Sequence, residues 1–252
     1  MVENIKELSL VIACYNEIPV LEESVRQILK TLDSTCWSYE VIFVDDCSQD
    51  GTPELIQKLV KQYADHDLRV MFHETNHGRG RTVSDGFRIA RGNVVGYIDV
   101  DLEVPAFYIP TMVIAIHDGA DIATAYRIYK IAFRLFHRFL MNNGYKFVMR
   151  LALGLPLKDT ETGYKFFRRD RLLAILDEVK DEGWFWDTEI MTRAFLAGYR
   201  IEEIPCLFTK RYDKKSSVHL FRDTYDYFVK LIKFRRVVQK IQKTSKAVVE
   251  QA

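Results

Sequence analysis

LSLVIA (residues 8–13), EESVRQILKTL (22–32) and YEVIFVD (39–45) place an amphipathic run between two short runs rich in β-branched residues. TPELIQKLVKQYA (52–64) and LRVMFHE (68–74) continue the same alternation. Short apolar strands that alternate with helices are typical of βαβ units, in which the strands are parallel. The sequence therefore predicts an α/β fold, with a mostly parallel sheet flanked by helices.

A further apolar strand, NVVGYID (93–99), runs into acidic residues in GYIDVDLEVP (96–105). Asp99, Asp101 and Glu103 occupy alternate positions, so on an extended chain they share one face and repel one another unless a positive partner joins them. The carboxyl ends of parallel strands open toward the ligand crevice, and hard carboxylate oxygens suit Mg²⁺ or Mn²⁺. An ordinary acidic strand end at the surface is the alternative for this motif taken alone.

Three other segments lie at predicted strand ends or helix starts. VIACYNE (11–17) closes the first strand, and VIFVDDCSQDGT (41–52) places Asp45 and Asp46 at the end of the second. NHGRGRTVSDG (76–86) supplies glycines and two arginines before a helix, and both arginine and helix-start N–H groups favour phosphate. Capped turns are the alternative interpretation of these segments. Gly92 is predicted to close the helix that ends in FRIAR (87–91).

The pattern becomes less regular after Ala120. An aromatic and basic helix-like stretch (129–154) is followed by a predicted polar turn, LKDTETGYKFF (157–167), a helix around DTEIMTRAFLAG (187–198) and a final strand in IEEIPCLFTKR (201–211). The tail, residues 219–252, predicts a basic amphipathic helix. One interpretation is that this helix packs on the domain and exposes its basic face to solvent. The other is that it rests on an anionic membrane surface, and the two interpretations are compatible because a packed helix can still present its lysines to lipid.

Composition narrows the class of protein. The chain has 252 residues, 48% of them apolar, and a formal net charge of +1, which gives no general attraction for nucleic acid. Its four cysteines have no CxxC spacing, as expected of free thiols in a reducing compartment. The N-terminal segment does not suit a signal peptide, and no run approaches the roughly 20 apolar residues of a membrane-spanning helix. We therefore expect a cytoplasmic protein.

Taken together, these motifs resemble inverting family-2 glycosyltransferases with the GT-A fold, a Rossmann-like sheet. VIACYNE is similar to VIPAYNE, VIFVDDCSQDGT to VVVDDGSTDGT, NHGRG to NxGKG, and YIDVD to the DxD strand. DVDLEVP looks like the DADLQxP of dolichol-phosphate mannose synthases, and KDTETGYKFFRR, WFWDTEIMTRAFLAGYRIEEIP and LFTKRYDKKSSV look like later motifs of the dolichyl- and polyprenyl-phosphate sugar synthases. The resemblance covers residues 8–218 and implies a catalytic domain at 1–218, followed by the helical tail at 219–252.

The resemblance also implies roles for individual residues. Asp99 and Asp101 would hold Mg²⁺ or Mn²⁺ on a diphosphate, with Glu103 as a further ligand where the synthases often carry glutamine. Asp46 would reach the nucleotide base. The nucleotide pocket would comprise Ala13, Tyr15, Glu17, Asp46 and Arg79. Basic positions for donor and acceptor phosphates would be Arg127 and Arg211, with Arg134, Arg138 and Lys214 as further candidates for the acceptor phosphate. The transferred sugar would lie near Asp159, Trp186, Asp187 and Glu189.

Three positions depart from the pattern that the resemblance suggests. Ala13 stands for the usual proline, Cys47 for the usual glycine and Arg79 for the usual lysine. The first two can alter backbone geometry, so they bear on the shape of the nucleotide pocket.

The implied activity is the inverting transfer of a hexose from a GDP- or UDP-sugar to a polyprenyl (dolichyl) phosphate, by an enzyme peripheral to the cytoplasmic face of a membrane. An anionic acceptor oxygen needs little help from a base. A saccharide or protein hydroxyl acceptor is the alternative, and it would need one, for which Asp187 and Glu189 are the candidates. A non-catalytic module that binds nucleotide sugars or membrane surfaces is the other alternative.

Overall fold

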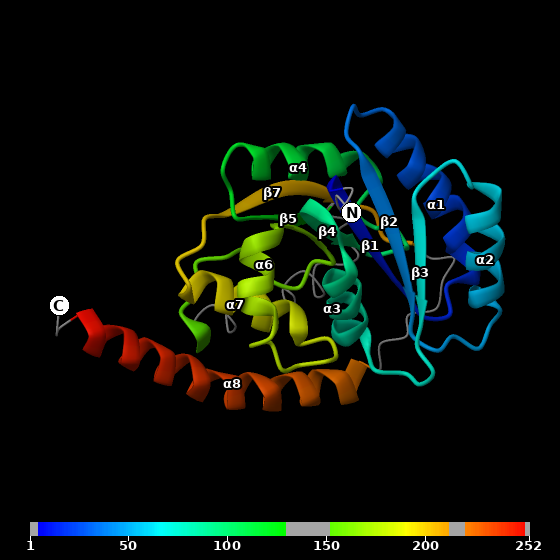
Figure 1. Ribbon diagram of the computed structural model, residues 1–252. Helices are drawn as coiled ribbons and strands as arrows, with labels where there is room; N and C mark the ends of the chain where they lie inside the picture. Colours follow the sequence, from blue (N-terminus) through cyan, green and yellow to red (C-terminus); the bar gives the residue numbers. More distant parts are fainter. Residues whose placement is uncertain (1–4, 130–151, 212–219, 250–252) are drawn as a thin grey trace.

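A seven-stranded sheet forms the centre of the computed structural model, which describes residues 5–129, 152–211 and 220–249 (Figure 1). The strands lie in the order β3-β2-β1-β4-β6-β5-β7. Their bounds are β1 Lys6–Cys14, β2 Tyr39–Asp45, β3 Leu68–Phe72, β4 Gly92–Ile98, β5 Ile122–Tyr129, β6 Tyr164–Arg168 and β7 Ile201–Phe208. β1 pairs in parallel with β2 on one side and β4 on the other, so the strand order reverses beside β1. Open α/β sheets bind ligands at such a reversal, beyond the carboxyl ends of the strands.

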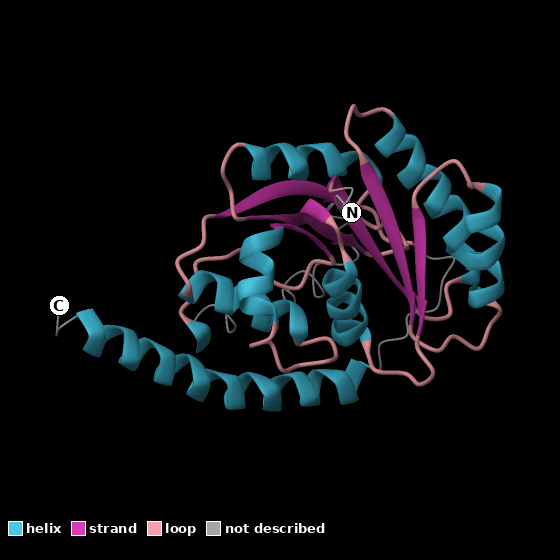
Figure 2. Ribbon diagram, in the orientation of Figure 1, coloured by secondary structure: helices cyan, strands magenta, loops and turns pink. Residues whose placement is uncertain are grey.

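Helices cover both faces of the sheet (Figure 2). One face carries α1 (Ile18–Asp33), α2 (Thr52–Gln62) and α4 (Ile109–His117), with the 3₁₀ turn η1 (Ala106–Tyr108) leading into α4. The other face carries α3 (Arg79–Ile89), α6 (Arg169–Leu176) and α7 (Trp186–Leu196). Alternate residues of β1 divide between the two layers: Leu10 and Ile12 belong to the first core and Val11 to the second. The predicted helix-flanked, mostly parallel α/β sheet is confirmed.

Two local predictions are wrong. Gly92 does not close α3, which ends at Ile89; it is the first residue of β4, where a Cβ atom would lie 2.5 Å from the Ser9 backbone nitrogen of β1. The predicted polar turn at 157–167 runs into a strand, because Tyr164, Phe166 and Phe167 bury their rings in β6. β6 lies antiparallel between β4 and β5, and it is the antiparallel element of the described sheet.

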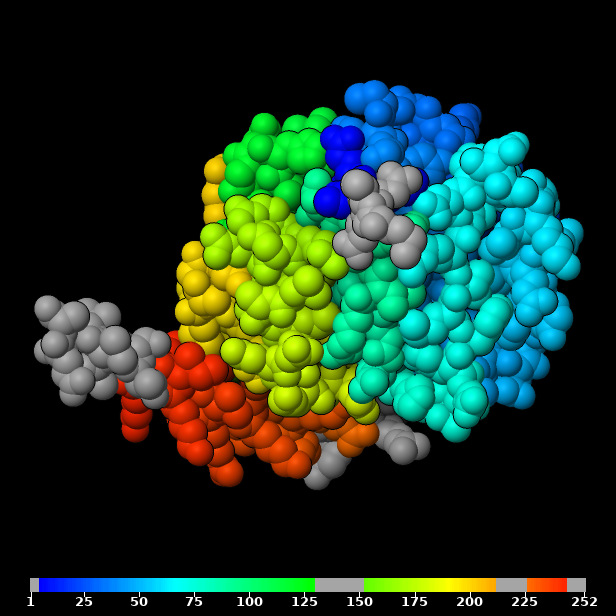
Figure 3. Space-filling view, viewed as in Figure 1, coloured from blue at the N-terminus to red at the C-terminus, as the bar shows by residue number. Residues whose placement is uncertain are grey.

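The tail contains the predicted helix, α8 (Leu220–Val249). Leu231, Phe234 and Val238 are buried in a third apolar cluster with Leu153 and Phe185, so this side of α8 packs on the domain. Figure 3 shows α8 running along one edge of the molecule. Across the residues that the structure describes, we find no helix with the length and apolarity needed to cross a membrane.

Candidate active site

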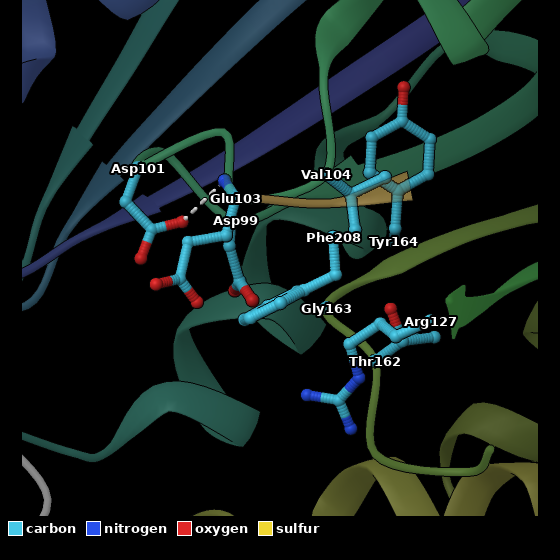
Figure 4. A pocket seen from close by; sticks show the side chains of 9 residues that line it. All are labelled: Asp99, Asp101, Glu103, Val104, Arg127, Thr162, Gly163, Tyr164 and Phe208. Carbon is cyan, nitrogen blue, oxygen red and sulfur yellow. Dashed lines mark hydrogen bonds between the residues drawn. The ribbon is translucent and has the colours of Figure 1, made fainter. Parts of the chain in front are cut away.

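An acidic pocket opens beyond the end of β4. Its lining includes Asp99, Asp101 and Glu103 from the β4–η1 loop, Arg127 from β5 and Phe208 from β7. In Figure 4 the three carboxylates gather on one side of the pocket, and the guanidinium of Arg127 lies on the other. The three acids that alternate in the sequence therefore lie at one opening.

Backbone contacts fix the first of these acids beside Gly163. The Asp99 N–H donates to the Gly163 carbonyl at 2.8 Å. A Cβ atom at position 163 would lie 2.0 Å from Asp99 Oδ2, so only glycine leaves room for this carboxylate. Leu102 has a φ of 51°, in the left-handed region, and Asp101 Oδ1 accepts the Glu103 N–H at 3.2 Å. The loop is therefore a sharp turn rather than the extended chain that the alternation implied.

The donor atoms of this pocket fit a divalent cation that is shared with a ligand. All three side chains offer carboxylate oxygens, the atoms that Mg²⁺ and Mn²⁺ prefer. Within the described parts of the chain, no three acidic, histidine or cysteine side chains converge closely enough to enclose a metal by themselves. Mg²⁺ typically takes one or two protein carboxylates and completes its coordination with phosphate oxygens and water. The acidic pocket suits a cation that takes one or two of its carboxylates and completes its coordination with phosphate oxygens and water.

The two predicted arginines lie at this pocket. The Arg211 N–H donates to Glu103 Oε1 at 3.1 Å, and its Nη1 donates to the Asp101 carbonyl at 3.3 Å. Arg127 forms a two-pronged ion pair with the buried Asp159, Nε to Oδ2 at 2.8 Å and Nη2 to Oδ1 at 3.0 Å. Burial works against the charge of Arg127, but the Asp159 carboxylate outweighs it and holds the arginine pKa above its ordinary value. Asp159 therefore fixes the orientation of the Arg127 guanidinium at the pocket.

Asp187 is the centre of a buried charge cluster. It accepts hydrogen bonds from Arg79 Nη1 and the Tyr97 hydroxyl, and from Lys165 Nζ at 2.6 Å. Burial opposes ionisation of Asp187, but the charges of Arg79 and Lys165 prevail and keep its pKa below the ordinary value. Burial also lowers the pKa of Lys165, against the attraction of Asp187. The cluster holds Asp187 as a paired anion.

Two other residues predicted near the sugar lie apart from the acidic pocket. Glu189 accepts the N–H groups of Lys180 and Asp181 at 3.1 and 2.9 Å, and it pairs with Arg193 at 2.8 Å. Trp186 is buried in the core, where its indole N–H donates to Ser84 Oγ at 2.9 Å. Both residues fix α7 against its neighbours.

The predicted nucleotide side lies at the ends of β1 and β2. Asp46 is buried; its carboxylate accepts the N–H groups of His77 and Gly78 at 2.8 Å each and contacts His73 Nδ1 at 2.8 Å. Glu17 is buried at the start of α1, and its N–H donates to Thr52 Oγ1 at 2.8 Å.

The other two predicted nucleotide residues differ in exposure. Tyr15 is 41% exposed, whereas Ala13 is partly buried against the core. Asp46 thus ties the end of β2 to the loop that begins α3, and Arg79, the remaining nucleotide candidate, is the first residue of that helix.

Cys47 occupies a backbone conformation that favours glycine. Its φ is 63°, where an L-residue pays roughly 1–2 kcal/mol, and its thiol donates a weak hydrogen bond to the Glu74 carbonyl at 3.4 Å. We expect Cys47→Gly to raise the free energy of unfolding by about 1 kcal/mol, measured as a higher urea midpoint at unchanged m-value. Cys47→Ala keeps the Cβ atom and should give no such gain. A Cys47→Gly variant no more stable than Cys47→Ala would contradict this.

Sequence reasoning missed two residues of the site. Gly163 and Lys165 flank the start of β6, and the polar-turn interpretation of that segment concealed them; an apolar alternation through GYKFF was the available signal. The remaining acceptor candidates, Arg134, Arg138 and Lys214, lie outside the described residues.

The sequence matches the family described as Glycosyl transferase family 2 over residues 9–176. Glycosyltransferase AglD of Haloferax volcanii is 34% identical over 222 residues, 86% of this chain and 35% of that protein. Dolichol-phosphate mannosyltransferase of Pyrococcus furiosus is 33% identical over 169 residues, 65% of this chain and 47% of that protein. The chain thus spans about a third to a half of these two relatives.

A solved structure shares the fold. Glucosyl-3-phosphoglycerate synthase from Mycobacterium tuberculosis, in complex with Mn²⁺, uridine-diphosphate and glucosyl-3-phosphoglycerate, gives a TM-score of 0.68 over 91% of this chain and 80% of that one. Its sequence is 16% identical, so the likeness concerns the fold alone.

Proposed function

Because the chain belongs to glycosyl transferase family 2, we propose that it moves a hexose from a nucleotide-diphosphate sugar to a polyprenyl phosphate, with inversion and with the help of a divalent cation. The observation that carries the proposal is the pocket in which three carboxylates face Arg127. The side of the pocket that carries the three carboxylates suits a divalent cation bound to a diphosphate. The side that carries Arg127 suits an anionic group such as a phosphate. The dolichol-phosphate mannosyltransferase of Pyrococcus furiosus supports the acceptor class.

Asp99 and Asp101 would hold the cation, with Glu103 beside them. A bound Mg²⁺ or Mn²⁺ supplies charge compensation for the departing nucleoside diphosphate. The glucosyl-3-phosphoglycerate synthase, which was solved with Mn²⁺ and UDP, supports this use of the fold. Arg127 and Arg211 would bind and orient phosphate oxygens at the same opening, and their charges matter most as the leaving oxygens become more negative.

The state of the other carboxylates favours a phosphate acceptor over a hydroxyl. A hydroxyl acceptor needs a base that can take up its proton, and the two candidates are Asp187 and Glu189. Asp187 is paired with Arg79 and Lys165, and Glu189 with Arg193 and two backbone N–H groups. The lowered pKa of Asp187 makes it a weak base, and both carboxylate oxygens of Glu189 already accept hydrogen bonds. A phosphate oxygen is already anionic near neutral pH, so positioning by Arg127 and Arg211 would suffice.

The experiment is a transfer assay. The protein is incubated with Mn²⁺ or Mg²⁺, a panel of labelled GDP- and UDP-sugars and either a polyprenyl phosphate or a set of saccharides. We expect label to enter the organic phase only with the lipid phosphate, and NMR of the product to show the opposite anomeric configuration to the donor. Label in the saccharide fraction alone would replace the lipid acceptor with a hydroxyl acceptor. No transfer from any donor would reject the proposal.

Gly163 offers a test of the carboxylate position. Because a Cβ atom there would lie 2.0 Å from Asp99 Oδ2, Gly163→Ala must push the carboxylate away. We expect kcat to fall about 100-fold, since a shift of about 1 Å in a positioned group can cost that much. The matched control is Gly183→Ala, whose Cβ atom would meet nothing closer than 3.5 Å. Equal activity of the Gly163→Ala variant and the wild-type protein would mean that Asp99 need not stay in place.

We further propose that α8 rests on an anionic membrane surface, where a lipid acceptor would be found. Its buried side already packs on the domain, whereas Phe228, Ile232 and Val237 are exposed at 50%, 46% and 39%. Its exposed basic residues include Lys233, Arg235, Arg236, Lys240 and Lys243. Asp226 is the one acid among residues 226–243. Each basic residue near anionic headgroups contributes about 1 kcal/mol, and exposed apolar side chains can enter the interface.

Vesicle sedimentation tests this placement. We expect the wild-type protein to bind vesicles that contain phosphatidylserine and to be released by salt, because surface charges are screened. The combined variant Lys233→Gln, Arg236→Gln, Lys240→Gln should bind about 100-fold more weakly, from about 1 kcal/mol for each charge. Lys30→Gln, Lys58→Gln, Lys61→Gln changes the same net charge on α1 and α2 and should bind normally. Equal binding of both triple variants would place the membrane contact elsewhere.

A further inference from the structure

Arg79 bridges two carboxylates that differ in their freedom to move. Its Nη2 lies 2.6 Å from Asp99 Oδ1, and its Nη1 donates to Asp187. The Asp99 side chain is 49% exposed, and that of Asp187 is 3% exposed. The guanidinium carbon lies 5.4 Å from the ring centres of both Tyr97 and Trp184. The Arg79 guanidinium therefore lies near two aromatic rings, with one ion pair to the buried Asp187 and one to Asp99 at the opening of the pocket.

The contact with Asp187 is the firmer of the two. Lys165 Nζ and the Tyr97 hydroxyl hold Asp187 from its other side, and a buried anion cannot lose its cations without a large cost. Asp99 has water within reach and can exchange one positive partner for another. The charges alternate from the core to the opening as Lys165, Asp187, Arg79 and Asp99.

We infer that Arg79 is the resident counter-ion of Asp99, and that it passes to the donor's diphosphate when a divalent cation takes its place on that carboxylate. This rests on the proposed function, because it assumes that Asp99 binds a cation and that the donor carries a diphosphate. A divalent cation bound to Asp99 Oδ1 would lie beside the guanidinium nitrogen that is 2.6 Å from the same oxygen, and the two positive charges would repel each other. Asp187 keeps the released arginine at the opening, where its N–H groups can bind phosphate oxygens.

The identity of this residue matters, because the related motif usually has lysine here. A planar guanidinium can donate to two carboxylates at once, whereas an ammonium is a single point charge. We expect a lysine at position 79 to stay with the buried Asp187 and to leave Asp99. The arginine therefore makes cation binding and donor binding depend on each other: a cation alone must displace Arg79, but a cation that arrives with a diphosphate gives Arg79 a new partner. Such coupling is reciprocal between the two ligands.

The test measures Mn²⁺ binding by titration calorimetry and by the paramagnetic resonance signal of free Mn²⁺, with no acceptor present. Without nucleotide, Arg79→Lys and Arg79→Gln should bind Mn²⁺ about tenfold more tightly than the wild-type protein, within the usual range of coupling between sites. With UDP or GDP, the gain in Mn²⁺ affinity should be smaller in both variants than in the wild-type protein. Asp99→Asn should remove the binding.

Two comparisons keep the outcome unambiguous. Arg81→Gln removes a positive charge two residues away that pairs with Asp85 and Glu182, so it measures the effect of the field alone. Arg79→Lys keeps the charge and tests the contact. The inference is overturned if Arg79→Lys binds Mn²⁺ no more tightly than the wild-type protein, if Arg81→Gln matches Arg79→Gln, or if no variant binds Mn²⁺. Because no sugar transfer is measured, failure of the transfer assay leaves this result intact.

Discussion

Asp99→Asn is expected to lower kcat for sugar transfer by about 10²- to 10³-fold, the usual loss when one preorganised electrostatic group is removed. The amide keeps the shape of the side chain beside Gly163 but has no charge to offer a cation, and it gives up the ion pair with Arg79. The measurement is the initial rate at saturating donor and Mn²⁺. The free energy of unfolding should change by less than about 1 kcal/mol, because half-exposed ion pairs contribute little to stability.

Two companion variants sharpen this prediction. Asp101→Asn should cause a loss of the same order, since its carboxylate lines the same pocket. Asp65→Asn, at an exposed position after α2, removes an equal charge from a remote surface and should leave the rate unchanged. Full activity of Asp99→Asn or Asp101→Asn at saturating Mn²⁺ would exclude these carboxylates from the reaction.

Lys165→Met is expected to lower the free energy of unfolding by about 3 kcal/mol at neutral pH, because removal of one member of a buried ion pair leaves its partner under-compensated. Lys165 is fully buried, and its Nζ lies 2.6 Å from Asp187 Oδ1. Methionine fills a similar volume but brings no charge. Urea denaturation measures the loss. Lys165→Arg keeps the charge and should recover part of it, whereas Lys180→Met, on the surface, should cost little.

The pH dependence of this variant has a definite sign. In the wild-type protein the pKa of Asp187 lies below its ordinary value, so its pairing stabilises the fold above the ordinary carboxyl pKa and is lost as the pH falls through the lowered one. Without Lys165 the pKa of Asp187 must rise, so this stabilisation shrinks. The stability difference between wild type and Lys165→Met should therefore be largest near neutral pH and should narrow in acid. A difference that widens below pH 4 would contradict this charge assignment.

Local sequence patterns predicted those parts of the fold that depend on local periodicity. The alternation of strand and helix through residue 98 gives β1, α1, β2, α2 and β3 close to their bounds, because each element buries its own apolar face. β6 was missed because its five residues follow a polar segment and include Lys165 as the second of them. Its place between β4 and β5 is set by pairing with strands far away in the chain. No local pattern encodes that choice.

The candidate site, like the fold, was predicted only in part from the sequence. Motif resemblance selected Asp99, Asp101, Glu103, Arg127 and Arg211, and the structure brings all five to one opening. Which charges pair was beyond the sequence, because the partners are distant: Arg79 and Asp187 are 108 residues apart. The buried lysine was harder to recognise, since it follows a polar segment and only its place between Tyr164 and Phe166 indicated a strand.

If Asp46 reaches the nucleotide base, as we propose, it limits the way in which this chain could acquire a different donor. Its carboxylate accepts the N–H groups of His77 and Gly78, the two residues before Arg79. A substitution at Asp46 that favoured another base would therefore release the start of α3 and displace the arginine that reaches Asp99. Selection for a new nucleotide would carry a penalty in turnover at this position. Tyr15, another residue that we propose for the nucleotide pocket, is 41% exposed, so we expect substitutions that change donor preference to be tolerated better there.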